Sequence, residues 1–191
     1  MNYYIILAAL TPVLILLFYI YRKDKNQPEP TKEMIKAFFY GVASVMMSLC
    51  LSIPFEKMGL YVSEYKTMVE AMRTSFFAAA IPEEVAKYVM LWLFLRKCKY
   101  FDQRMDGIVY AVCVSLGFAA LENVMYLLGS YNEWVSVGIS RALTAVPGHF
   151  GFGVLMGYYY SLGKFDSQNF ASARYKALIV PIIVHGLYDF I

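Results

Sequence analysis

The sequence predicts an all-α protein, a polytopic transmembrane helical bundle of about six spans. Of the 191 residues, 60% are hydrophobic and only 16% are charged, against about 25% charged residues in soluble globular proteins. The mean hydropathy is +0.51, and apolar runs of roughly 20 residues, long enough to cross a bilayer, recur along the chain. Alternating segments of about ten residues, typical of a membrane-spanning barrel, are not found.

Six apolar segments are expected to form the helices of a single integral membrane domain, residues 1–191. The first has no basic leader and no small-residue cleavage site, so it is expected to be a retained helix. The last is about 15 residues long, shorter than a comfortable span, which suggests that the chain is truncated within a hydrophobic helix. The segments are Tyr3–Tyr21, Met34–Phe55, Met72–Leu95, Met105–Leu128, Gly138–Leu162 and Ala177–Ile191.

Basic residues are concentrated in alternate connections between these segments, and this bias predicts the orientation. The connections after the first, third and fifth segments hold eleven lysines and arginines, against Lys57 and Lys66 in the others. Since basic loops stay in the cytoplasm, we expect the N-terminus to face outward. The eleven are Arg22, Lys23, Lys25, Lys32, Arg96, Lys97, Lys99, Arg104, Lys164, Arg174 and Lys176.

Composition also excludes several function classes. The net charge of +3 is modest and gives no indication of nucleic acid binding. Cys50, Cys98 and Cys113 lie in different segments without a CxxC pair, so we expect neither a disulfide nor a cysteine metal site.

Adjacent carboxylates interrupt the third apolar segment. Glu83 and Glu84 follow Pro82 and precede Lys87, and each charge near the bilayer centre costs about 2.5–3.5 kcal/mol on insertion scales. Glu83 and Lys87 are spaced i,i+4 and are expected to pair, which leaves Glu84 about 100° away around the helix and free to act as a base. Pro82 is expected to kink the helix and make room for these groups.

Further ionisable residues lie in the last three segments. Counted at about 1.5 Å per residue, Glu84 and the residues Glu122, His149 and His185 fall in the central or outer half of the membrane, so they are expected to share one cavity open to the outside. The polar residues in these segments are Glu122 and Asn123, Arg141 and His149, and His185 and Asp189.

This set of side chains suits hydrolysis by an activated water molecule. A glutamate in a low-dielectric pocket can take a proton from water, and histidines can bind a metal or stabilise an oxyanion. Asp189 lies one turn from His185 and can orient its imidazole. Arg141 is expected to anchor at the interface or to meet a substrate carbonyl or lipid phosphate. No serine or cysteine is placed to act with either histidine, which disfavours a covalent mechanism.

Four ordered motifs in the sequence resemble those of the PrsW-type membrane proteases, which are related to the CAAX prenyl proteases and bacteriocin self-immunity proteins. Pro82-Glu-Glu-Val-Ala-Lys87 resembles their EExxK motif, and Phe118-Ala-Ala-Leu-Glu122-Asn123 is similar to their FxxxEN motif. Arg141 followed by His149, and then His185-Gly-Leu-Tyr-Asp189, resemble the two later motifs. The resemblance covers nearly the whole chain.

The resemblance implies a bacterial plasma-membrane endopeptidase that makes the first cut in a membrane-spanning anti-sigma factor, on its extracytoplasmic side, to activate a stress response. We expect Glu84, or else Glu83, to be the base. Glu122, His149 and His185 either hold a zinc ion or stabilise the oxyanion directly, and both readings remain open. The alternatives are a non-proteolytic sensor or immunity protein that binds peptides, and an ion- or proton-coupled carrier; the complete acidic and histidine set and the absence of an inverted repeat disfavour them.

Overall fold

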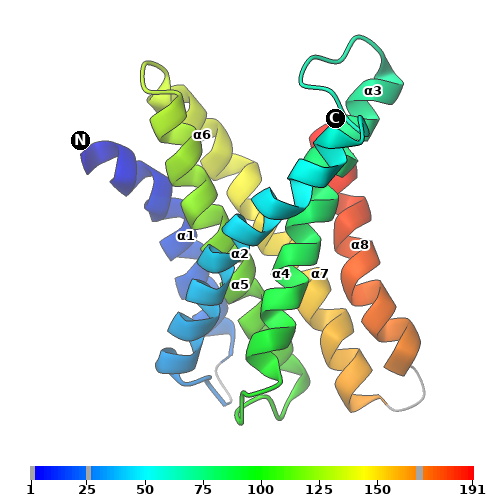
Figure 1. Cartoon of the computed structure of the whole chain (residues 1–191). Coiled ribbons are helices and arrows are strands. Elements are labelled where there is room, and N and C mark those ends of the chain that lie inside the picture. The colour runs from blue at the N-terminus through cyan, green and yellow to red at the C-terminus, as the bar shows by residue number, and fades with distance from the viewer. Residues whose placement is uncertain (1–2, 25–26, 167–169) are drawn as a thin grey trace.

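The computed structural model describes residues 3–24, 27–166 and 170–191, and every regular element among them is helical (Figure 1). Four helices are long and apolar enough to cross a membrane: α1 (Tyr3–Lys23), α2 (Thr31–Lys57), α5 (Arg104–Gly129) and α8 (Phe170–Phe190). The prediction of a polytopic helical membrane protein is therefore confirmed. Lys25, one of the basic residues used to predict orientation, lies outside the described residues.

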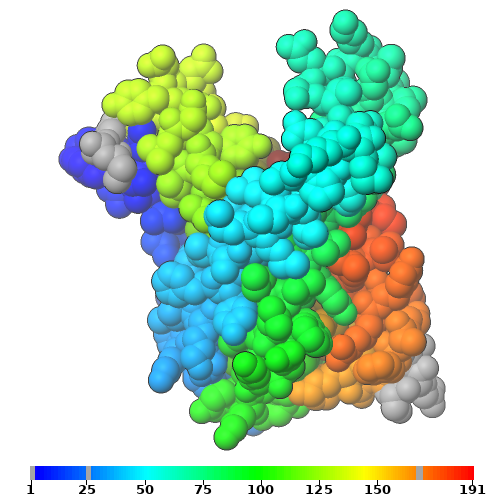
Figure 2. All heavy atoms as spheres, in the orientation of Figure 1, coloured from blue at the N-terminus to red at the C-terminus, as the bar shows by residue number. Residues whose placement is uncertain are grey.

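The C-terminal ends of α1, α4 (Ile81–Leu95) and α7 (Ala145–Phe165) and the N-terminal ends of α2, α5 and α8 lie at one end of the bundle, which we call the basic end (Figure 1). The opposite end holds the N-terminal helix end, α3 (Met68–Thr74), α6 (Trp134–Leu143) and the C-terminus. In the space-filling view a broad notch at this opposite end separates α6 from the α2–α3 region (Figure 2).

The third apolar segment forms a continuous but irregular helix. Between α3 and α4, residues Ser75–Ala80 form a π-helix, η1, whose wider turn is a frequent feature of functional sites. Pro82 follows in the first turn of α4. A proline ring clashes with the carbonyl four residues earlier in a regular α-helix, and the wide turn ahead of Pro82 accommodates it. The expected disturbance at Pro82 therefore takes the form of a π-helix.

The fifth apolar segment is not one helix, contrary to the prediction for Gly138–Leu162. It breaks at Thr144, whose backbone has φ −122° and ψ −65°, between α6 and α7. Pro147 explains the break, because in an uninterrupted helix its ring would clash with the carbonyl of Leu143, whereas proline is tolerated in a first helical turn.

The prediction of a short last span is also wrong. Helix α8 begins at Phe170, so that Arg174 and Lys176 belong to its first two turns, and it has 21 residues. It is therefore long enough to cross the hydrocarbon core.

Helix α5 is the centre of the bundle. Of its most apolar 18-residue window, 72% is buried, and its neighbours include α7, α2 and α1. Glycine permits the close contact with α2, since a Cβ added at Gly41 would lie 1.9 Å from the Val114 carbonyl oxygen and one at Gly117 would lie 2.0 Å from that of Phe38. Small residues commonly allow membrane helices to approach in this way. The site residues on α5 thus sit on the most deeply buried of the four candidate spans.

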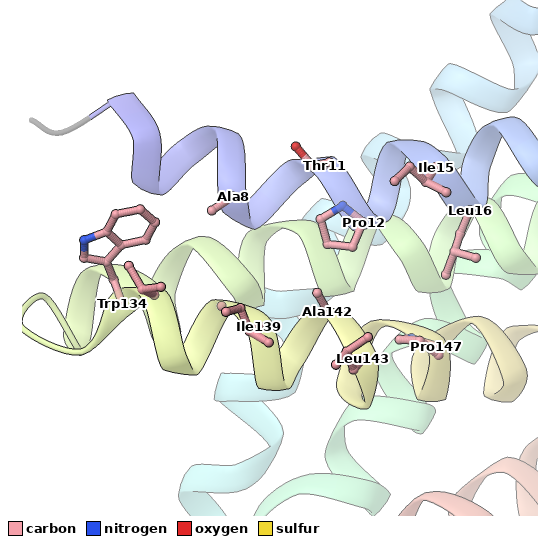
Figure 3. Close-up of a pocket in the computed structure, with 12 residues that line it drawn as sticks. Ala8, Thr11, Pro12, Ile15, Leu16, Trp134, Ile139, Ala142, Leu143 and Pro147 are labelled. Carbon is pink, nitrogen blue, oxygen red and sulfur yellow. The ribbon is translucent and has the colours of Figure 1, made fainter.

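A groove of about 530 Å³ lies between α1 and α6 and is lined by apolar side chains such as Ile15, Ile139 and Leu143 (Figure 3). Thr11 is its polar member and none of its lining residues is ionisable. It therefore has the lining expected of a lipid-facing groove and lacks the groups that acid–base chemistry needs.

Candidate active site

The ionisable residues predicted from the sequence meet in a separate pocket of about 250 Å³. Five helices contribute: Glu83 comes from α4, Glu122 from α5, His149 from α7, and His185 with Asp189 from α8, and the fifth helix is α6. Arg141 closes one side from the last turn of α6. Glu84, Lys87 and Asn123 do not line the pocket; they are buried directly behind it. The structure thus brings the whole predicted set into one cluster.

Lys87 lies at the centre of this cluster with a fully buried side chain. Its Nζ atom is 2.8 Å from Glu84 Oε1 and 3.3 Å from Glu83 Oε2. It is also 3.0 Å from His149 Nδ1 and 4.1 Å from the centre of the Phe118 ring. The expected pair of Lys87 with Glu83 is present, but the expectation that Glu84 is left free is wrong, because the ammonium also binds Glu84 and lies closer to it.

The two glutamates differ in access to the pocket. The Glu83 side chain is 13% exposed and lines the pocket, whereas that of Glu84 is 0% exposed. Glu84 Oε1 is held by Lys87 and by His185 Nδ1, at 2.9 Å. Its Oε2 is buried without a hydrogen-bond partner among the described residues. Water in the pocket can therefore reach Glu83, and Glu84 is the interior member of the pair.

The protonation of His149 follows from its two partners. Lys87 has only donors, so Nδ1 of His149 accepts from it, and the ring proton is then on Nε2. From there it is donated to Glu122 Oε2 at 2.9 Å. Arg141 forms an ion pair with the same carboxylate, and its Nε donates to Asn123 Oδ1 at 2.7 Å. Glu122 thereby holds both an imidazole and a guanidinium at the wall of the pocket.

His185 lies between carboxylates on both sides. Its Nδ1 is 2.9 Å from Glu84 Oε1, and its Nε2 is 3.3 Å from Asp189 Oδ2 and 3.9 Å from Glu83 Oε2. Ionised carboxylates only accept hydrogen bonds, so a ring flanked by them donates from both nitrogens and is an imidazolium. Asp189 contacts this ring from one turn away, the position that its spacing from His185 predicted.

Further contacts support the site, and two of the residues that make them, Phe152 and Ser115, were not identified from the sequence. Phe152 stacks on the His185 ring with centroids 4.5 Å apart and an interplanar angle of 20°. The Ser115 hydroxyl donates to the His149 carbonyl oxygen at 2.6 Å, and the Asn123 amide donates to the Ala9 carbonyl oxygen at 3.1 Å. Nothing in the sequence distinguishes Phe152 or Ser115 from other aromatic and small residues in apolar segments. Asn123 is part of a motif, but its bond to α1 requires the tertiary structure.

The three potential metal ligands that the described part of the chain brings together are not the predicted trio of Glu122, His149 and His185. Ligand atoms of Glu83, Glu84 and His149 all lie within 4.8 Å of one another. Carboxylate oxygens and an imidazole nitrogen are suitable zinc ligands, and the unpartnered Glu84 Oε2 offers a further oxygen. The donor chemistry therefore fits a divalent ion.

A second group of buried carboxylates lies at the basic end, remote from this pocket. Glu29 accepts a hydrogen bond from the Tyr110 hydroxyl, and its backbone N–H donates to Asp24 Oδ2 at 3.3 Å. Burial raises the pKa of Glu29 to about 8, with a further contribution from the neighbouring Asp106 carboxylate and a partial offset from the Tyr110 hydrogen bond. This group joins the α1–α2 connection to α5 and takes no part in the active site.

Comparison with known proteins agrees with this arrangement. The profile of the PrsW family of intramembrane metalloproteases matches residues 29–191, which include every site residue described above. A protein named Protease PrsW from Clostridioides difficile (strain 630) is 36% identical over 188 residues, covering 97% of this chain and 77% of the relative. One of the same name from Bacillus subtilis (strain 168) is 36% identical over 191 residues, covering 98% of this chain and 82% of the relative. No solved structure matches significantly. A match over most of the chain, together with the cluster of acidic and histidine residues inside the membrane helices, shows that the chain belongs to the PrsW family of intramembrane metalloproteases.

Proposed function

We propose that this protein hydrolyses a peptide bond of a membrane-spanning protein with a water molecule activated by Glu83. The observation that supports this choice is the access of the paired carboxylates to the pocket: Glu83 lines it, and Glu84 is shut behind Lys87 and His185. A general base must reach the proton that it removes. The sequence favoured Glu84 for this role, and the geometry favours its neighbour.

The neighbouring residues supply the remaining roles. Glu83 takes a proton from water as the water oxygen attacks the carbonyl carbon, and it returns the proton to the amine nitrogen when the carbon–nitrogen bond breaks. The negative charge that develops on the carbonyl oxygen is stabilised by positively charged donors in a water-poor site. The His185 imidazolium, 3.9 Å from Glu83, and Arg141 on the opposite wall are the cations that border the pocket. Glu122 holds Arg141 and His149 in place.

The metal that the family description implies would be held by Glu83, Glu84 and His149. A carboxylate has two oxygens, so Glu83 can contribute one to the ion and keep the other for water. When bound, such an ion supplies a Lewis acid that lowers the pKa of a coordinated water. We include a zinc ion in the proposal on the basis of this donor set, whereas the sequence pointed to Glu122, His149 and His185.

The position of the pocket supports the proposed side of cleavage. It lies between Arg141 in the last turn of α6 and Asp189 near the end of α8, and it is nearer the end of the bundle opposite the basic connections. If the basic end is cytoplasmic, the N-terminus is outside and the cut is extracytoplasmic. A single-pass protein such as an anti-sigma factor in a bacterial plasma membrane, the substrate implied by the sequence resemblance, fits this geometry, and a single domain spanning 1–191 would contain the complete site.

The test uses purified protein in lipid vesicles with a single-pass membrane substrate. We expect one cut on the side opposite the basic end, and a loss of at least about 100-fold in rate for Glu83→Gln, the order of magnitude contributed by a general base. Glu64→Gln is the matched control, since Glu64 is exposed in the connection before α3. Unchanged cleavage by folded Glu83→Gln protein would rule out the proposed base.

A further inference from the structure

The position suited to a metal ion already contains a positive charge. The three atoms that contact the Lys87 ammonium, Glu83 Oε2, Glu84 Oε1 and His149 Nδ1, belong to the three residues that can hold an ion. We call this set of three residues the cage. The Lys87 side chain is completely buried, and its Nζ atom also lies 4.1 Å from the centre of the Phe118 ring, so the ammonium is enclosed by protein.

The present dimensions of the cage match an ammonium group. The three contacts to Nζ measure 2.8, 3.0 and 3.3 Å, which are ordinary hydrogen-bond and ion-pair distances. Zinc requires its oxygen and nitrogen ligands at about 2.0–2.2 Å. Binding therefore requires the ligands to move inward, and no space is left for a nitrogen atom at the centre.

Electrostatic repulsion prevents the Lys87 ammonium and a divalent metal ion from occupying the cage together. Two adjacent buried carboxylates without a counter-charge would repel each other and lose their hydration, and Lys87 supplies the missing charge in the metal-free state. A divalent ion in the same position would supply it instead and would repel the ammonium at close range in a medium of low dielectric constant.

We propose that Lys87 is an internal counter-ion that occupies the cage in the metal-free protein and is displaced when a divalent metal binds. Lys87 keeps Glu83, Glu84 and His149 assembled, and it lowers the affinity of the cage for metal because its ion pairs must break first. This inference rests on the metal ligands named in the proposed function, and its test measures binding without any substrate.

The first experiment compares zinc and cobalt affinities of purified protein at one pH, by equilibrium dialysis with metal analysis. We expect Lys87→Met to bind one ion per chain at least about tenfold more tightly than the wild-type protein. Methionine fills a similar volume and carries no charge. Lys164→Met is the matched control, because Lys164 also lies over aromatic rings, those of Phe101 and Phe165, but at the basic end. It should bind metal as the wild-type protein does. Equal or weaker affinity of Lys87→Met, or no binding by either protein, would overturn the inference.

A second experiment uses the wild-type chain and does not depend on the folding of a variant. Reductive methylation followed by mass spectrometry reports how accessible each lysine amine is. We expect Lys87 to be protected without metal and to be modified at least several-fold faster at saturating zinc, while Lys36, whose side chain is 52% exposed, reacts equally in both states. Unchanged protection of Lys87 at saturating zinc contradicts displacement. Failure of the proposed function would instead appear as unimpaired cleavage by Glu83→Gln.

Discussion

Gly157 on α7 offers a sharp test of how helix packing positions the active site. A Cβ added at Gly157 would lie 2.4 Å from the carbonyl oxygen of Gly107, 2.6 Å from Ile108 Cα and 2.8 Å from the Gly107 carbonyl carbon. All three atoms belong to the backbone of α5, so no side-chain rotation can relieve the clash. Ordinary contact begins at 3.4 Å, and α7 must therefore move away from α5 by about 1 Å, the difference between 3.4 and 2.4 Å.

This displacement should affect both stability and catalysis in Gly157→Ala. Overpacking of this kind costs about 1–3 kcal/mol, which lowers the Tm by roughly 2–12 °C for a chain of this size. His149 lies about two turns earlier on the same helix and hydrogen-bonds to Glu122 on α5 across the same interface. Because a misplacement of about 1 Å can reduce rates about 100-fold, we also expect a large fall in cleavage.

The assay is thermal unfolding of the detergent-solubilised protein, followed by cleavage of the membrane substrate below the lower Tm. Gly151→Ala is the control on the same helix, since a Cβ there meets no atom within 4 Å. It should leave both quantities unchanged or raise the Tm slightly, because alanine favours helix more than glycine does. If Gly157→Ala has the Tm and activity of Gly151→Ala, the reasoning from close α5–α7 contact is refuted.

Two further predictions concern residues that do not line the pocket. The raised pKa of Glu29, about 8, means that the native state binds more protons than the unfolded state between pH 4.5 and 8, so wild-type stability falls as pH rises through this range. Glu29→Gln removes the titrating group, so the stability of the variant relative to wild type, measured by thermal unfolding, should increase from pH 5 to pH 8. Plots of stability against pH that run parallel for the two proteins would contradict this. Asn123→Ala removes the hydrogen bonds to Ala9 and Arg141, at a cost of about 1 kcal/mol, which should appear as a lower Tm; an unchanged Tm would show that these bonds contribute nothing measurable.

Local sequence was sufficient to predict the helical class and most of the helices. A run of about 20 apolar residues can satisfy its backbone hydrogen bonds in a membrane only as a helix or a closed barrel, and that requirement does not depend on neighbouring segments. The break at Thr144 had a local signal in Pro147, which was not used, and the first two turns of α8 were missed because Arg174 and Lys176 resemble loop residues.

The sequence also predicted which residues form the site. Charged groups in apolar helices are costly unless they meet one another, so Glu83, Glu84, Glu122, His149 and His185 were expected in one place, and the structure brings them together.

The division of labour within the site depended on the tertiary structure. Glu83 and Glu84 lie about 100° apart around α4, so which of them faces the pocket is set by the rotation of that helix. The π-helix ahead of Pro82 and the packing of α4 against α2, α5 and α8 fix that rotation. The packing of α7 against α5 and α8 places His149 Nδ1 beside Lys87, and this contact makes Glu83, Glu84 and His149 the candidate metal ligands. The hydrophobicity of a segment depends only on its own residues, whereas the direction in which its side chains point depends on how that helix packs against its neighbours. The sequence by itself therefore determined the fold class and which ionisable residues come together, and the tertiary structure decided which glutamate lines the pocket and which charge occupies the cage.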